Sequence, residues 1–156
     1  MRSDSLNQNS SVFNTQPFAV GYIGANIDIS DDADKVKNRV WFINATGVTS
    51  ITIPDPGEFN AGDWIKFVIT AAIAGDMTIK TETADSDMYG HLHGSGGAAY
   101  ASNPDTANKD KIVYDVSACA SGAGDLGDSL FLLSDGTNWY VEGQTNGDVA
   151  WVFGEQ

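Results

Sequence analysis

The sequence has little cysteine, little positive charge and no long apolar run. Its 156 residues include a single cysteine, Cys119, which excludes an internal disulfide framework and any zinc site built from several cysteines. Eight Lys and Arg stand against 21 Asp and Glu, giving a formal net charge of −13. Phosphate binding draws on Lys and Arg, so this balance argues against a nucleic-acid partner and against docking to anionic membranes. It favours solubility and suits a partner with a positive surface.

Segments that would insert into a membrane are missing as well. No run approaches the roughly 18 apolar residues of a membrane span. The polar N-terminal residues hold no apolar core of signal-peptide length, so we expect the chain to be made in the cytoplasm. Residues 1–16 are rich in Ser, Asn, Gln and Thr. They predict either a frayed terminus or an arm that orders on a neighbouring subunit, with Val12 and Phe13 as its anchors.

A sustained helical period is also lacking, whereas short apolar or alternating runs recur between turn signals. The plainest is a hairpin, in which apolar runs at 128–133 and 139–141 flank Asp135-Gly136. The length indicates one domain, and 42% apolar residues argue against global disorder. We therefore predict an all-β fold, an antiparallel β-sandwich or jelly-roll-like domain of about eight or nine short strands over residues 17–156.

Within that domain, residues 82–110 show no clear period and hold several glycines, Pro104 and both histidines. We interpret them as a long insertion loop, because structureless segments of that length in compact domains are usually functional or mobile. The core is predicted from the alternation of apolar residues along the strands. The predicted core positions are Ile43, Ile51, Ile53, Ile65, Phe67, Ile69, Ile79, Val113, Leu130, Leu132, Trp139, Val141 and Phe153.

Two sequence patterns offer metal ligands. On a strand, His91 and His93 would share a face and could ligate zinc or nickel. The alternative, which we favour, is a solvated loop, so no metal or cofactor is expected. The acidic turn at Asp28–Asp34 fails the calcium-loop pattern, since Ala33 stands where Gly is required and Arg39 where the bidentate Glu belongs.

Other patterns give little support to catalysis. Residues 94–99 fit G-x-G-x-x-A, but Pro104 follows and no helical period does, which excludes a dinucleotide site. Cys119 has no basic neighbour in sequence and predicts an inert thiol, and no nucleophile-elbow pattern is present. We expect no enzyme. A cupin-like metal enzyme using His91 and His93 would need at least one further ligand.

Three blocks of the chain together resemble a known group of proteins. They are Val48–Pro54, Gly62–Phe67 and Leu130–Val141, spread over about 60% of the chain. The pattern is similar to that of virion proteins of tailed bacteriophages, among them capsid decoration (cement) proteins, head fibres and the β-rich modules of tail fibres. The residues 82–110 are not part of it.

The resemblance implies a non-enzymatic homotrimer on the outer surface of the virion capsid, clamping adjacent subunits of the major capsid protein. Candidate capsid contacts are Val12, Phe13 and Phe18, and candidate trimer-interface or exposed aromatics are Trp64, Trp151 and Tyr100. The alternative is a head-fibre or receptor-binding module that contacts a host-surface glycan through Trp64 or Trp151. The four tryptophans could form such a platform, but burial in the core or an interface is their commoner fate.

Overall fold

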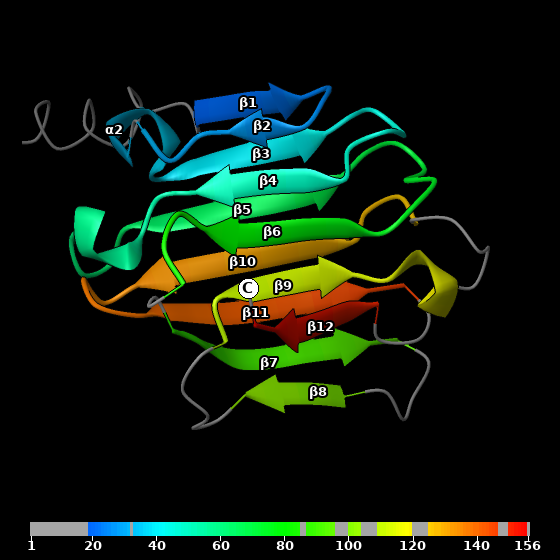
Figure 1. Cartoon of the computed structure of the whole chain (residues 1–156). Coiled ribbons are helices and arrows are strands. Elements are labelled where there is room, and N and C mark those ends of the chain that lie inside the picture. Colours follow the sequence, from blue (N-terminus) through cyan, green and yellow to red (C-terminus); the bar gives the residue numbers. More distant parts are fainter. Residues whose placement is uncertain are drawn as a thin grey trace, which may run out of the picture.

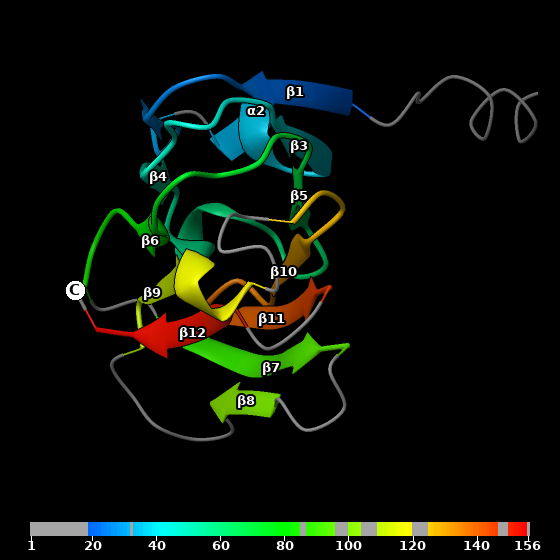
Figure 2. The same ribbon diagram turned by 90° about the vertical axis from the view of Figure 1, so that its right-hand side faces the viewer.

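Two β-sheets packed face to face make up the protein. The computed structural model describes residues 19–31, 33–84, 87–95, 100–103, 109–119, 125–146 and 150–155. Figure 1 shows the sheets face-on, and Figure 2, turned by 90° about the vertical axis, separates the two layers. The strands are β1 (Ala19–Ile23), β2 (Ile27–Asp28), β3 (Arg39–Ile43), β4 (Ser50–Ile53), β5 (Trp64–Ile69), β6 (Met77–Thr81), β7 (Met88–Gly94), β8 (Tyr100–Asn103), β9 (Lys111–Tyr114), β10 (Ser129–Ser134), β11 (Trp139–Thr145) and β12 (Trp151–Gly154).

In the residues that the structure describes, three short helical turns lie between the strands: α2 (Ala33–Val36), η1 (Pro56–Glu58) and η2 (Val116–Ala118). One sheet has seven strands in the order β1-β3-β5-β10-β11-β7-β8, and the other has five in the order β12-β9-β6-β4-β2. The predicted all-β sandwich is confirmed. It has more strands in its described residues than the eight or nine expected.

The first half of the chain winds as three flattened coils, made by β1–β2, β3–β4 and β5–β6. Each strand is followed by one in the opposite sheet, so consecutive strands of one sheet run parallel. The ladder continues past the strand ends, where Asn44 N–H donates to Ile23 O at 3.0 Å and Thr70 N–H donates to Ile43 O at 2.9 Å. Identical side chains stack inside, as Ile23, Ile43 and Ile69 occupy one register row.

These coils correct the expected topology. Five strand pairs in the described residues are parallel and five are antiparallel, so the sheets are mixed rather than antiparallel throughout. A jelly roll connects antiparallel strands, and the parallel coils depart from it. The physical reason lies in the turns. A Gly- or Pro-containing turn announces that a strand ends, but not whether the chain returns in the same sheet or crosses to the other.

The predicted hairpin is confirmed as β10–β11, paired antiparallel from Ser129↔Gln144 to Ser134↔Trp139. The carboxylate of Asp135 closes its turn by accepting hydrogen bonds from the N–H groups of Thr137 at 2.8 Å and Asn138 at 2.7 Å. Gly136 has φ +91°, a conformation that residues with a side chain rarely adopt.

The core lies between the sheets and is largely the predicted one. Eleven of the thirteen predicted positions are buried, the exceptions being Val113 and Phe153. In β9, Ile112 and Tyr114 point inward and Val113 points out. Ile112, Val113 and Tyr114 are all apolar, so no alternation of apolar and polar residues shows which of them face the core, and the prediction failed there. Phe153 is partly buried and packs against the core.

The expected loop at 82–110 contains two strands of the seven-stranded sheet. β7 pairs in parallel with β11 through seven residues and antiparallel with β8. Gly90, which has φ +148°, lies so close to β11 that an added Cβ would meet Val141 O at 1.9 Å. The strand was missed because it buries only Met88 and Leu92 among glycines and histidines, and this composition is typical of loops.

Candidate functional site

The outer face of the seven-stranded sheet carries many apolar and aromatic side chains, interrupted near its centre by Lys66, and we call it the aromatic face. These side chains alternate along the strands with buried core residues and are half-buried or exposed. They are Val20, Tyr22, Val40, Phe42, Trp64, Val68, Tyr89, Phe131, Leu133 and Tyr140.

The rings of the aromatic face lie in cross-strand pairs. Tyr22 and Phe42 join β1 to β3 with centroids 5.7 Å apart, and Trp64 and Phe131 join β5 to β10 at 5.9 Å. A third pair, Tyr89 with Tyr140, joins β7 to β11 at 6.3 Å. In the order of the sheet, these three pairs cover six neighbouring strands. Each tilted pair contributes roughly 0.5–1 kcal/mol beside the area it buries.

The opposite outer face, on the five-stranded sheet, is chemically different. Its outward positions on β2, β4 and β6 are Asp, Ser, Thr and Lys, and β9 adds Lys111. Val113 and Val152, side by side on β9 and β12, are its apolar exceptions. We call this the polar face. The contrast singles out one side of the sandwich as the apolar one, with Tyr22 67% and Tyr140 47% exposed to solvent.

The aromatic face is hollowed over β10, β11 and β7. An open depression of about 390 Å³ lies there, lined by the ring of Tyr140, the aliphatic side chain of Leu133 and the polar groups of His91, His93 and Glu142. Apolar walls with a few converging polar groups are the usual composition of a binding site.

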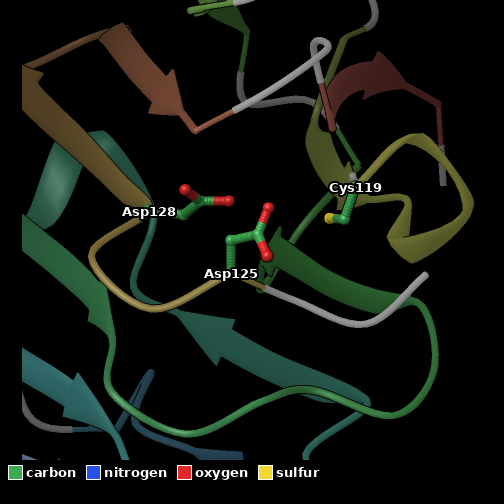
Figure 3. Close-up of side chains that lie close together, drawn as sticks. All are labelled: Cys119, Asp125 and Asp128. Carbon is green, nitrogen blue, oxygen red and sulfur yellow. The ribbon is translucent and has the colours of Figure 1, made fainter. Parts of the chain in front are cut away.

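A second cluster, of a different kind, lies buried where the two sheets meet. Figure 3 shows Cys119, Asp125 and Asp128 pointing toward one another, with ligand atoms that all lie within 4.8 Å. Cys119 follows η2, and Asp125 and Asp128 precede β10. In the described residues this is the one group of three or more His, Cys, Asp or Glu side chains whose ligand atoms already lie that close together.

Hydrogen bonds within the protein already satisfy the central groups of this cluster. Asp128 accepts from the Tyr114 hydroxyl at 2.5 Å and from the Asn146 N–H at 2.7 Å, one bond to each carboxylate oxygen. The same hydroxyl accepts from the Cys119 thiol at 3.2 Å and the Asp125 N–H at 3.1 Å. The cluster ties β9 of one sheet to the ends of β10 and β11 of the other, and we interpret it as structural.

The electrostatics of the cluster agree with that interpretation. Burial raises the pKa of the Asp128 carboxyl, and the hydrogen bonds from Tyr114 and Asn146 partly oppose this rise. Burial, followed by the bond to Asp128, raises the pKa of the Tyr114 hydroxyl. Burial also raises the pKa of the Cys119 thiol. A thiol held protonated is a poor nucleophile, in line with the inert cysteine expected from the sequence.

The structure distributes the candidate residues unevenly. Trp64 lies half-buried on the aromatic face, where its ring pairs with that of Phe131. Trp151 is wrong as an exposed aromatic, because it is fully buried and its ring packs on Tyr114 with centroids 4.6 Å apart. Tyr100 begins β8, but its side chain lies outside what the structure describes.

The remaining candidates can be placed as well. The expected capsid contacts Val12, Phe13 and Phe18 lie outside the described residues. His91 and His93 are on a strand and share its outer face, rather than lying in the solvated loop we favoured. In the acidic turn, Asp28 accepts hydrogen bonds from the N–H and hydroxyl of Ser30, and the bond from that hydroxyl is the largest cause of its lowered pKa.

Sequence reasoning missed most of the aromatic face. Tyr22, Phe42, Phe131 and Tyr140 were not singled out, although each is adjacent in sequence to a buried core residue of its strand. Their alternation with core residues was the available signal. It was passed over because apolar residues on both faces of a strand do not show which face is buried.

Comparison with models of known protein families, with curated proteins and with solved structures finds no match to this chain. In the residues that the structure describes, no helix has the length and apolar character needed to cross a membrane.

Proposed function

We propose that this protein is a binding module that docks through its aromatic face and performs no catalysis. In particular, we propose a structural virion protein, a capsid decoration protein that attaches to the outer surface of the major capsid shell and stabilises it. The observation that carries the proposal is the contrast between the two outer faces of the sandwich. Aromatic residues are enriched at protein interfaces, where large rigid rings bury much area at little entropic cost.

Two of the three blocks that resemble phage virion proteins support the same face. Val48–Pro54 forms β4, Gly62–Phe67 enters β5, and Leu130–Val141 spans the β10–β11 hairpin. β5, β10 and β11 are consecutive neighbours in the seven-stranded sheet. Two of the three blocks therefore fall on the centre of the sheet that carries the aromatic face, whereas Val48–Pro54 falls on the other sheet.

Charge and mass action fit this role. The net charge of −13 suits a partner with a positive surface and raises the rate of encounter with it. A protein that binds only the assembled shell opposes disassembly by mass action. The resemblance also implies a homotrimer. Sedimentation or light scattering would test this in solution, since a trimer of 16.5 kDa chains is readily separated from a monomer.

The direct test is binding to expanded, undecorated capsids of the virus that encodes the chain. The double variant Tyr22→Ser/Tyr140→Ser removes two exposed rings from the aromatic face, and Val113→Ser/Val152→Ser is its matched control on the polar face. Loss of one aromatic anchor costs about 2 kcal/mol, roughly 30-fold in Kd. We expect at least that loss for the aromatic double variant and wild-type binding for the control. Absence of wild-type binding at micromolar concentration would refute the proposal.

A second candidate, a receptor-binding or head-fibre module, is favoured by the depression on the aromatic face. There the ring of Tyr140 could stack on a sugar while Glu142 accepts hydrogen bonds from its hydroxyls. This module would bind a host-surface glycan on an array, and Tyr140→Ala would abolish the signal. A flat array together with capsid binding would leave the decoration protein as the function.

A further inference from the structure

The two histidines of the chain converge on one patch of β7. His91 and His93 flank the fully buried Leu92, so both imidazoles project from the outer face of the seven-stranded sheet, and both residues are exposed. Their ring centroids lie 6.3 Å apart, with the ring planes inclined by 50°. Spacing of two residues on a strand is what places two imidazoles on one side.

A carboxylate completes the patch from the adjacent strand. Glu142 of β11 is the register partner of His91 in the parallel β7–β11 pair, and it too is exposed. All three side chains line the same open depression. Two imidazoles and one carboxylate are the three protein ligands found in many zinc sites whose fourth position stays open.

The ring spacing is within reach of chelation. Zinc–nitrogen bonds of about 2.0–2.1 Å place the centres of two imidazoles on one tetrahedral ion roughly 5 Å apart. The observed 6.3 Å therefore requires an approach of about 1 Å. The ligand atoms of His91, His93 and Glu142 do not all lie within 4.8 Å of one another in this structure, so a bound ion would draw the three side chains together. Exposed side chains make such a movement by rotating about their side-chain bonds, without any change in the strand.

We propose that His91, His93 and Glu142 form a surface binding site for a divalent transition-metal ion of the Zn²⁺, Ni²⁺ or Cu²⁺ class. Imidazole donors suit these ions, whereas Ca²⁺ and Mg²⁺ prefer sites built from oxygen ligands. The open coordination position faces solvent on the aromatic face, where a side chain of a docked partner can occupy it. The proposal stands independently of the proposed function, because the site lies within a single chain.

The test is titration of the untagged full-length chain with Zn²⁺ alone and, separately, with Cu²⁺. We expect one ion per chain by calorimetry. Because the chain has only two histidines, every imidazole signal in an NMR spectrum reports on this site, and both residues should shift together. Cu²⁺ should bind more tightly than Ni²⁺, and Ca²⁺ should leave the imidazole signals unchanged.

Variants separate the site from general binding to an acidic protein. His91→Gln and His93→Gln should each weaken Zn²⁺ binding by more than the roughly 10–100-fold that loss of an outer-shell partner costs. Glu142→Gln should weaken it less. Asp34→Asn, which removes an exposed carboxylate from α2, should change nothing. Circular dichroism of each variant verifies that it is folded. If a variant fails to fold, the titration of the wild-type chain still tests the proposal.

Three results would overturn the proposal: no Zn²⁺ binding below millimolar concentration, a shift of only one of the two imidazoles, or histidine variants that bind as the wild type does.

Discussion

Replacing Tyr114 by Phe removes one oxygen atom from the centre of the buried cluster. Its hydroxyl donates to Asp128 and accepts from Asp125 N–H and the Cys119 thiol, and Tyr114 itself is fully buried. Phe keeps the aromatic ring and its packing on Trp151 at 4.6 Å. The variant therefore tests the hydrogen bonds without opening a cavity.

The cost follows from the bonds lost. A hydrogen bond to a charged group contributes about 1.5–3 kcal/mol, and two buried donors also lose their acceptor, so we expect about 2–4 kcal/mol at pH 7. For a chain of this length the melting temperature should fall by roughly 5–15 °C. Denaturant unfolding monitored by tryptophan fluorescence measures the loss in the free energy of unfolding. The exposed Tyr22→Phe is a near-neutral control.

The cost should also depend on pH. Burial raises the pKa of Asp128 in the folded protein, so this group contributes most stability below its unfolded pKa, about 3.9, and loses that contribution as pH rises through the folded pKa. The Tyr114 hydroxyl opposes that rise, so removing it raises the folded pKa further. The penalty should be smaller at pH 4 than at pH 7. A cost below about 0.5 kcal/mol at pH 7, or one that does not change with pH, would refute the structural role of the cluster.

Two further substitutions test the fold. Gly90→Ala places a methyl group against Val141 O at a positive φ and should reduce the free energy of unfolding by at least about 2 kcal/mol, with faster amide exchange in β7. Gly75→Ala, which has open space around it, should have neither effect. Equal effects of the two substitutions would contradict the β7–β11 pairing. Phe67 is fully buried, so Phe67→Ala should lower the free energy of unfolding by about 3–5 kcal/mol, as measured with denaturant. Lys66→Ala, at the neighbouring outward position, should have a much smaller effect. Similar values for the two would mean that the wrong face of β5 has been assigned to the core.

The sequence predicted the fold where local chemistry determines it. The β10–β11 hairpin followed from Asp135-Gly136, because that turn is stabilised by groups within four residues. The inward positions of β5 followed from strict alternation of Ile65, Phe67 and Ile69 with their neighbours. In both places, neighbouring residues in the sequence are enough to determine the local structure.

Long-range pairing could not be predicted in the same way. The parallel coils depend on which sheet a strand joins, and the buried Trp151 depends on β12 pairing with β9 across about 37 residues of chain. Of the proposed metal site, only the shared face of His91 and His93 could be anticipated. Glu142 joins them through the parallel pairing of strands whose partner residues are 51 positions apart, and neither strand's own sequence indicates that partner.

The coiled first half of the sandwich makes the two ends of the fold unequal. At one end β12 lies against β7 and β8 and closes the space between the sheets, as Figure 2 shows. At the other end β1 and β2 are the outermost strands of their sheets, and among the described residues the coil they form pairs with the next coil alone. In a stack of this kind each unit depends on its nearest neighbour. A protein with this architecture can therefore lengthen or shorten in evolution by whole coils at the β1–β2 end, while the hairpin, the buried cluster and the aromatic face over β10, β11 and β7 keep their places.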